Sequence, residues 1–136
     1  MSEGNPGYIL RVSTEEWLDQ VYRLNKYYPG LMRMYKPGTP ILLVRKAEGG
    51  DSFMGYGIID KVEMPWELPP IEEEYCRTNG WKCCITFRHL TRFNKPYPIK
   101  ESILKDDNRK GSYLHGVKLS EEQVDTILKE AEAFQG

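Results

Sequence analysis

Residues 8–24 read YILRVSTEEWLDQVYRL, a pattern that predicts a strand running directly into a helix. The strand covers residues 8–12. Ser13 stands three residues before Glu16, which is the capping-box spacing at which helices begin. The large apolar residues that follow recur at helical intervals: Trp17, Leu18, Val21 and Leu24. We therefore expect a helix over residues 14–26 with one apolar stripe, Trp17 included, packed against a core.

Three further strands are expected after this helix. Residues 41–44 and 53–59 are apolar runs of strand length, separated by a glycine-containing loop, and predict a hairpin. Gly55 and Gly57 interrupt the second run, which indicates either a bulge or a group that approaches the backbone closely. Residues 81–90 form the clearest strand, because their two faces differ in polarity as in a half-buried sheet.

The end of the chain predicts a second helix. Ser120 and Gln123 have the capping-box spacing, and an apolar stripe follows them: Val124, Ile127, Leu128 and Ala131. The proline-rich residues 64–70 and the polar residues 94–116 are expected to be loops. The resulting order is typical of an α+β fold, a curved mixed sheet or small β-barrel flanked by helices. With 136 residues, the chain is expected to be a single domain (residues 1–136), alone or as a module of a longer protein.

Several functional classes are disfavoured. The sequence contains no GxSxG, HExxH, Walker or GxGxxG motif, so we expect no enzyme and no cofactor. Its three cysteines lack a CxxC spacing and it has two histidines, so we expect no metal site and reduced thiols. No apolar run approaches the roughly 18 residues of a spanning helix, and no secretory signal is visible. A cytoplasmic protein without a membrane partner is expected.

The charge is unevenly distributed along the chain. Residues 76–118 hold ten Lys or Arg and three Asp or Glu, a net charge of +7. The other residues hold nine Lys or Arg and 17 Asp or Glu, a net charge of −8. Such a separation indicates a basic face for an anionic partner, although neighbouring solvated cations would give the same pattern.

Several of the 16 aromatic residues lie outside the periodic stripes. Tyr27 and Tyr28 are expected at the end of the first helix, and Trp66 in the proline-rich loop. Rings in such places either stack on a flat ligand such as a nucleobase or close the ends of a small barrel. Together with the basic segment, they favour the binding interpretation.

Four stretches together resemble the PUA-like superfamily, specifically the EVE domains and the related YTH domains. Residues 8–17 resemble the opening strand and capped helix, and residues 34–43 (MYKPGTPILL) resemble the KPGD turn before the second strand. Residues 53–59 resemble the GxG return strand, and residues 116–120 precede the closing helix. The resemblance spans nearly the whole chain and implies the PUA-like fold.

The resemblance also implies a function, because such domains bind nucleic acid and several hold a flipped-out, methylated base in an aromatic cage. By position, Ser13 is expected at the base edge, and Tyr27 takes the place of the first cage tryptophan of YTH domains. Tyr28 competes with it for that wall. Trp66 is the expected second wall and Met54 the floor of this base-binding pocket.

Cations from three parts of the chain are assigned to the phosphates. The resemblance places Arg11, at the end of the first strand, on a phosphate. It also matches Arg109 and Lys110 to a late loop that touches the nucleic-acid backbone in YTH domains; otherwise this loop is an exposed connection. Arg88 and Arg92, on the main strand, complete the expected phosphate-binding set.

The leading hypothesis is a domain that captures a methylated base, such as 6-methyladenine or 5-methylcytosine, in DNA or RNA. One setting is the DNA-recognition module of a modification-dependent restriction system, with a fused or partner ATPase or nuclease. The first alternative is a PUA-like RNA-binding or RNA-processing protein without selectivity for modified bases. The second is a nucleoside-directed enzyme of the ASCH type. The third is a module whose basic face docks on an acidic protein.

Overall fold

A computed structural model of the chain describes residues 6–107 and 111–135. Its centre is one six-stranded sheet in the order β2-β5-β4-β3-β1-β6. The strands are β1 (Gly7–Arg11), β2 (Lys26–Tyr27), β3 (Pro40–Ala47), β4 (Gly50–Glu63), β5 (Cys84–Pro98) and β6 (Lys118–Leu119). The helices are α1 (Glu15–Leu24), α2 (Pro70–Asn79) and α3 (Glu121–Gln135), with 3₁₀ turns η1 (Pro65–Glu67), η2 (Ile99–Glu101) and η3 (Gly111–Leu114). The predicted α+β class is confirmed.

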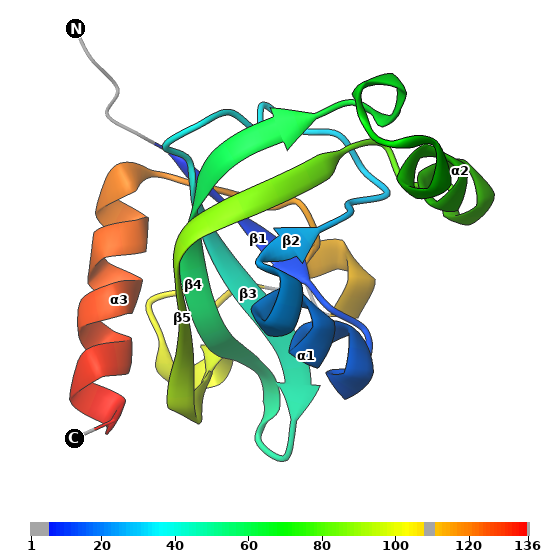
Figure 1. Cartoon of the computed structure of the whole chain (residues 1–136). Helices are drawn as coiled ribbons and strands as arrows, with labels where there is room; N and C mark the ends of the chain where they lie inside the picture. The colour runs from blue at the N-terminus through cyan, green and yellow to red at the C-terminus, as the bar shows by residue number, and fades with distance from the viewer. Residues whose placement is uncertain (1–5, 108–110, 136) are drawn as a thin grey trace, which may run out of the picture.

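The sheet is mixed, strongly curved and not closed (Figure 1). β1 pairs in parallel with β3 and antiparallel with β6, and the predicted hairpin is β3 with β4. β4 and β5 pair along most of their length, with three shifts of register that let them bend. Of the two expected forms, the curved sheet is therefore the one observed.

The predicted role of Gly55 is also confirmed. The sheet register shifts beside it, and a Cβ at this position would collide with the Thr91 carbonyl oxygen and the Tyr22 hydroxyl. The glycine thus lets β5 and a side chain of α1 lie directly against the β4 backbone.

Two hydrophobic clusters lie on opposite faces of the sheet, because adjacent strand residues point to opposite sides. Leu10 packs in the cluster that includes Leu18 and Val21 of α1, whereas Ile9 packs in the cluster that includes Ile127 of α3. Figure 1 shows α1 and α3 on either side of the strands, and α2 apart from both, beyond the ends of β4 and β5.

The beginning and end of α1 differ from the prediction. Its N-cap is Thr14, whose hydroxyl accepts a hydrogen bond from the Trp17 backbone N–H at 3.2 Å, and not Ser13. The helix ends at Asn25, which has a left-handed backbone (φ 57°), so residues 25 and 26 are outside it. Tyr27 therefore lies on strand β2, which pairs with β5, and not at a helix end.

The capping box of α3 is confirmed. The Gln123 backbone N–H donates to the Ser120 hydroxyl at 3.1 Å, and the Gln123 side chain accepts from the Ser120 backbone N–H at 2.9 Å. Such reciprocal bonds satisfy two donors that the first turn leaves without partners.

Helix α2 was not predicted, because only Cys76 of its ten residues is buried and no apolar stripe reveals it. The acidic run of residues 72–74 lies in this helix. The main strand was placed at residues 81–90 but covers Cys84–Pro98, so residues 94–98 are strand and not loop. Among the described residues, no helix is long and apolar enough to cross a membrane.

Candidate functional site

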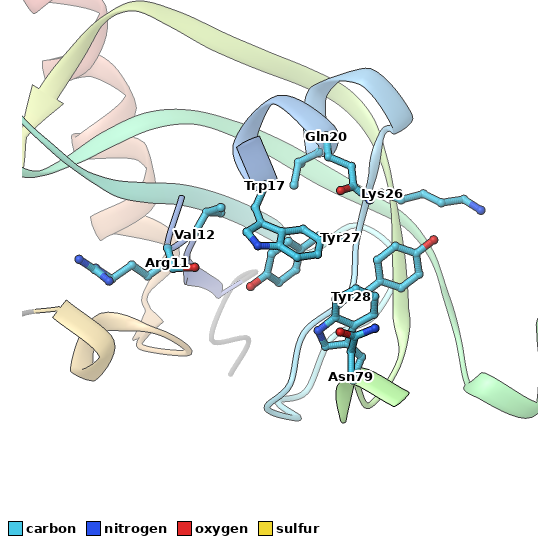
Figure 2. A pocket seen from close by; sticks show the side chains of 11 residues that line it. Arg11, Val12, Trp17, Gln20, Lys26, Tyr27, Tyr28 and Asn79 are labelled. Carbon is cyan, nitrogen blue, oxygen red and sulfur yellow. The ribbon is translucent and has the colours of Figure 1, made fainter. Parts of the chain in front are cut away.

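A cavity of about 220 Å³ opens between β1, α1, β2 and the end of α2 (Figure 2). Four aromatic side chains line it: Trp17, Tyr27, Tyr28 and Trp81. The loop between β1 and α1 contributes Val12 and Ser13. The cavity thus has a largely aromatic wall that comes from segments far apart in the sequence.

Trp17 was predicted to be a core residue, and this prediction is wrong. Leu18 and Val21 are the buried residues of the helical stripe, whereas Trp17 is 37% exposed, on the first turn of α1. It meets Trp81 edge to face, with ring centroids 5.6 Å apart and planes at 87°. Trp81 comes directly after Gly80, whose left-handed backbone (φ 70°) ends α2.

Tyr28 is the second partner of Trp81. The two rings are stacked, with centroids 4.9 Å apart and planes at 17°. The Tyr28 hydroxyl donates a 2.7 Å hydrogen bond to the Glu72 carboxylate of α2. The same Glu72 oxygen accepts from the Lys26 ammonium at 3.1 Å and the Cys84 thiol at 3.8 Å. One carboxylate therefore joins α2 to β2, β5 and the aromatic wall.

The ionisation of this group of side chains follows from its contacts. Burial would raise the pKa of Glu72, but the hydrogen bonds from Tyr28 and Lys26 outweigh it and lower that pKa. Burial, followed by the bond to Glu72, raises the pKa of Tyr28. Glu72 is thus a carboxylate and Tyr28 a neutral phenol at neutral pH.

Tyr27 forms another part of the wall. Burial raises the pKa of its phenol to about 12. Its ring lies 6.3 Å from that of His115, at 56°. Burial, and then the nearby Arg33, lower the pKa of His115, whose Nδ1 accepts a 3.0 Å hydrogen bond from the Arg11 backbone N–H. The phenol and imidazole are consequently both neutral at pH 7.

Neutral polar side chains also line the cavity. The Asn79 amide donates to the Tyr75 carbonyl at 2.8 Å, which leaves its own side-chain oxygen as an acceptor. The half-buried Gln20 amide and the Ser13 hydroxyl make no side-chain hydrogen bond within the described part of the chain. An amide and a hydroxyl can both donate and accept, as the edge of a nucleobase requires.

Of the predicted pocket residues, Ser13, Tyr27 and Tyr28 lie together in this cavity, whereas two others do not. Trp66 is 70% exposed on η1 and is not among the lining residues. Met54 is buried in the cluster beneath α1. The sequence placed Trp66 near the site because it follows the return strand, but the undetected helix α2 separates η1 from Trp81, the tryptophan that lines the cavity.

The predicted phosphate-binding residues are also divided. Arg11 lines the cavity, but its guanidinium is paired with Asp51 at 3.1 Å and points away from the Trp17 and Tyr27 rings (Figure 2). Arg88 and Arg92 do not line the cavity. Arg88 lies 3.9 Å from Asp60, and Arg92 pairs with Asp19 at 2.9 Å. Arg109 and Lys110 lie outside the described residues.

Seven residues of the lining were not predicted as site residues: Val12, Trp17, Gln20, Val21, Lys26, Asn79 and Trp81. Trp81 and Asn79 depend on α2, which has no periodic signal, and Gln20 and Lys26 carry no motif. Within the described ranges, no group of three or more His, Cys, Asp or Glu is placed to hold a metal ion.

Proteins of low sequence identity share this fold. The ASCH protein of Zymomonas mobilis is 10% identical, with 94% of this chain and 96% of that one aligned at a TM-score of 0.63. A hypothetical protein from Leishmania major is 13% identical over 100% of both chains, with a TM-score of 0.65. The YTH domain of the Zygosaccharomyces rouxii MRB1 protein, in complex with N6-methyladenosine RNA, is 12% identical. Here 96% of this chain and 89% of that one are aligned at a TM-score of 0.59.

These similarities establish the fold and not the function. The chain has the PUA-like fold, as its sequence predicts, and the ASCH and YTH domains share it. Its assignment to the EVE domains in particular stays a prediction. No family model and no curated protein matches the sequence.

Proposed function

We propose that this chain is a non-enzymatic nucleic-acid-binding domain that captures one unpaired, methylated base in its aromatic cavity. The observation that carries the proposal is the cavity itself, whose lining combines four aromatic side chains with neutral polar groups and with two cations, Arg11 and Lys26, that are each paired with a carboxylate. Such a lining suits a ligand that is flat, uncharged and hydrogen-bonding at its edge, and a nucleobase has all three properties.

The size of the cavity favours a single base. Its volume of about 220 Å³ is below the roughly 300–1,000 Å³ of pockets that enclose drug-sized ligands. Stacking a base on an aromatic side chain contributes about 1–3 kcal/mol, which offsets the cost of unstacking an unpaired base from its neighbours. Ser13, Gln20 and Asn79 supply hydrogen bonds to the base edge.

Selectivity for a methylated base is the finer part of the proposal. A methyl group buried against aromatic rings gains about 0.8 kcal/mol, or about fourfold in affinity. The polar lining is unchanged by methylation, so this gain is not offset. N6-methyladenine, present in the RNA bound to the similar YTH domain, and 5-methylcytosine are the first bases to test.

Binding without catalysis is supported by the ionisation of the cavity. Tyr27 and Tyr28 have raised pKa values, which makes them poor bases and nucleophiles at neutral pH. The two cations of the lining are also engaged, Lys26 by Glu72 and Arg11 by Asp51. The cavity suits DNA and RNA equally, so we include recognition of modified DNA beside a partner ATPase or nuclease among the settings of this function.

Titration with short single-stranded DNA and RNA oligonucleotides, with and without one methylated base, tests the proposal. We expect tighter binding of a methylated strand by about fourfold, and a loss of roughly 5- to 100-fold in Trp81→Ala. Trp66→Ala is the matched control, because this tryptophan is exposed outside the cavity. Trp17→Ala removes a second, partly exposed ring of the cavity, so it tests the same site if Trp81→Ala impairs folding.

Two results would contradict the proposal. Equal affinity for methylated and unmethylated strands would remove the selectivity. Equal affinity of Trp17→Ala, Trp81→Ala and Trp66→Ala, in proteins with unchanged melting temperatures, would remove the cavity as the site.

A further inference from the structure

A second, larger cavity adjoins the aromatic one. Its volume is about 420 Å³, and Arg11 lines both. Three lysines from separate segments meet around it: Lys46 near the end of β3, Lys100 in η2, and Lys105 beyond η2. Lys46 is 54 or more residues away from Lys100 and Lys105 in the sequence, yet all three line one hollow beside the aromatic cavity.

The floor of this second cavity is apolar and fixed. Ile99, Leu104 and Leu114, which line it, are buried in the cluster beneath α3. The lysines are exposed at its sides. A hollow with a rigid apolar base and charged walls accepts a compact ion and leaves the ammonium groups free to turn toward it.

The charges around the hollow do not balance. Of the residues that the structure describes, four cations line it, against the two carboxylates of Asp51 and Asp107. Asp51 is engaged by Arg11 at 3.1 Å. Among the described residues, none of the three lysines has a carboxylate within 4 Å. Their mutual repulsion would be relieved by an anion with several acceptor oxygens.

The geometry of Arg11 adds to this argument. Its Nε and one terminal nitrogen both donate to a single Asp51 oxygen, at 3.2 and 3.1 Å. A guanidinium carries five N–H donors, so its other terminal nitrogen is left for a second acceptor. Asp51 and Arg11 both line the second cavity, and Figure 2 shows the Arg11 side chain directed away from the aromatic rings.

We infer that this lysine cavity, formed by Lys46, Lys100, Lys105 and Arg11, is a binding site for the phosphate that flanks the captured base. The inference rests on the proposed function, since a strand whose base enters the aromatic cavity carries phosphates on both sides of that nucleotide. Arg11 is the common wall, so the base and a neighbouring phosphate bind on its two sides. This gives Arg11 the phosphate contact that the sequence predicts, but with lysine partners that the sequence did not indicate.

The test compares Lys100→Gln/Lys105→Gln with Lys36→Gln/Lys129→Gln. Both double variants remove two positive charges, and the control pair is exposed and lines neither cavity. Binding of a methylated single-stranded oligonucleotide is measured at several salt concentrations. We expect the cavity variant to bind roughly tenfold more weakly at low salt, with the slope of log K against log[salt] reduced by about 0.7 per lost phosphate contact.

Two smaller probes separate this inference from the proposed function. The methylated nucleoside has no phosphate, so we expect it to bind the Lys100→Gln/Lys105→Gln variant as it binds the parent protein and to lose affinity in Trp81→Ala. Inorganic phosphate, followed by amide chemical shifts, is expected to perturb residues near Lys46 and Lys100 in the parent protein and not in the variant. Phosphate binding at this cavity can thus be detected even if no base is captured.

The inference is overturned if the cavity variant and the control variant have the same oligonucleotide affinity and the same salt slope. It is also overturned if inorganic phosphate perturbs no residue around the hollow, or if it perturbs the variant as much as the parent protein. Failure of the nucleoside to bind, with a lysine-dependent salt slope retained, would contradict base capture and leave the phosphate site supported.

Discussion

Tyr28 and Glu72 are joined by a 2.7 Å hydrogen bond between the phenol hydroxyl and the carboxylate. Tyr28 follows β2, Glu72 belongs to α2, and the Tyr28 ring stacks on Trp81 at the far end of that helix. This bond therefore attaches α2 to the sheet and sets the orientation of two rings of the aromatic cavity. It also helps to hold α2 against the sheet, since only Cys76 of this helix is buried.

We expect Glu72→Ala to lower the free energy of unfolding by about 1–3 kcal/mol. The substitution leaves the partly buried Lys26 ammonium and Tyr28 hydroxyl without their common acceptor. Urea unfolding measures the change, and Glu74→Ala, at an exposed position of the same helix, is the control. Equal stability of the two variants would show that the Glu72 contacts contribute nothing.

Glu72 also predicts how stability depends on pH. Its pKa is lowered in the folded protein, so its contribution is present above its ordinary value of 4.5 and is lost as the pH falls through the lower, folded value. Wild-type protein should therefore lose more unfolding free energy below about pH 4.5 than Glu72→Gln does. Parallel pH dependences in urea unfolding would contradict the assignment.

Gly55→Ala should destabilise the protein by roughly 3 kcal/mol or more. The new Cβ would meet the Thr91 carbonyl oxygen and the Tyr22 hydroxyl, so β4, β5 and α1 would all have to move. Gly30→Ala is the control, since the nearest atom to its Cβ would be 3.9 Å away. Thermal unfolding of the two variants distinguishes a close approach from a general effect of replacing glycine.

The cap of α1 can be identified by two neighbouring substitutions. Thr14→Ala removes the acceptor of the Trp17 backbone N–H and should cost about 1 kcal/mol. Ser13→Ala, one residue earlier, should change stability by much less. A larger loss in Ser13→Ala, measured by chemical denaturation, would restore the capping box that the sequence alone predicts.

The predictable parts of the fold are those with a local signal. The spacing of Ser120 and Gln123 determines a cap through bonds within one turn, and the apolar runs at residues 41–44 and 53–59 pair across a short loop. The sequence could not reveal α2, because its helix rests on contacts such as that of Glu72 and not on an apolar stripe. Trp66 was consequently chosen for the cavity where Trp81 belongs.

By itself, the sequence determined the α+β class; the PUA-like arrangement and the grouping of Ser13, Tyr27 and Tyr28 in one pocket were expected from its resemblance to PUA-like domains. Hydrophobic period, caps and turns act over a few residues and are therefore legible in the chain. The tertiary structure alone decided that Trp17 and Trp81 complete the aromatic wall, and that Lys46 meets Lys100 and Lys105 around a second hollow. These neighbours are brought together by the curvature of the sheet and the packing of α2, which no local pattern encodes.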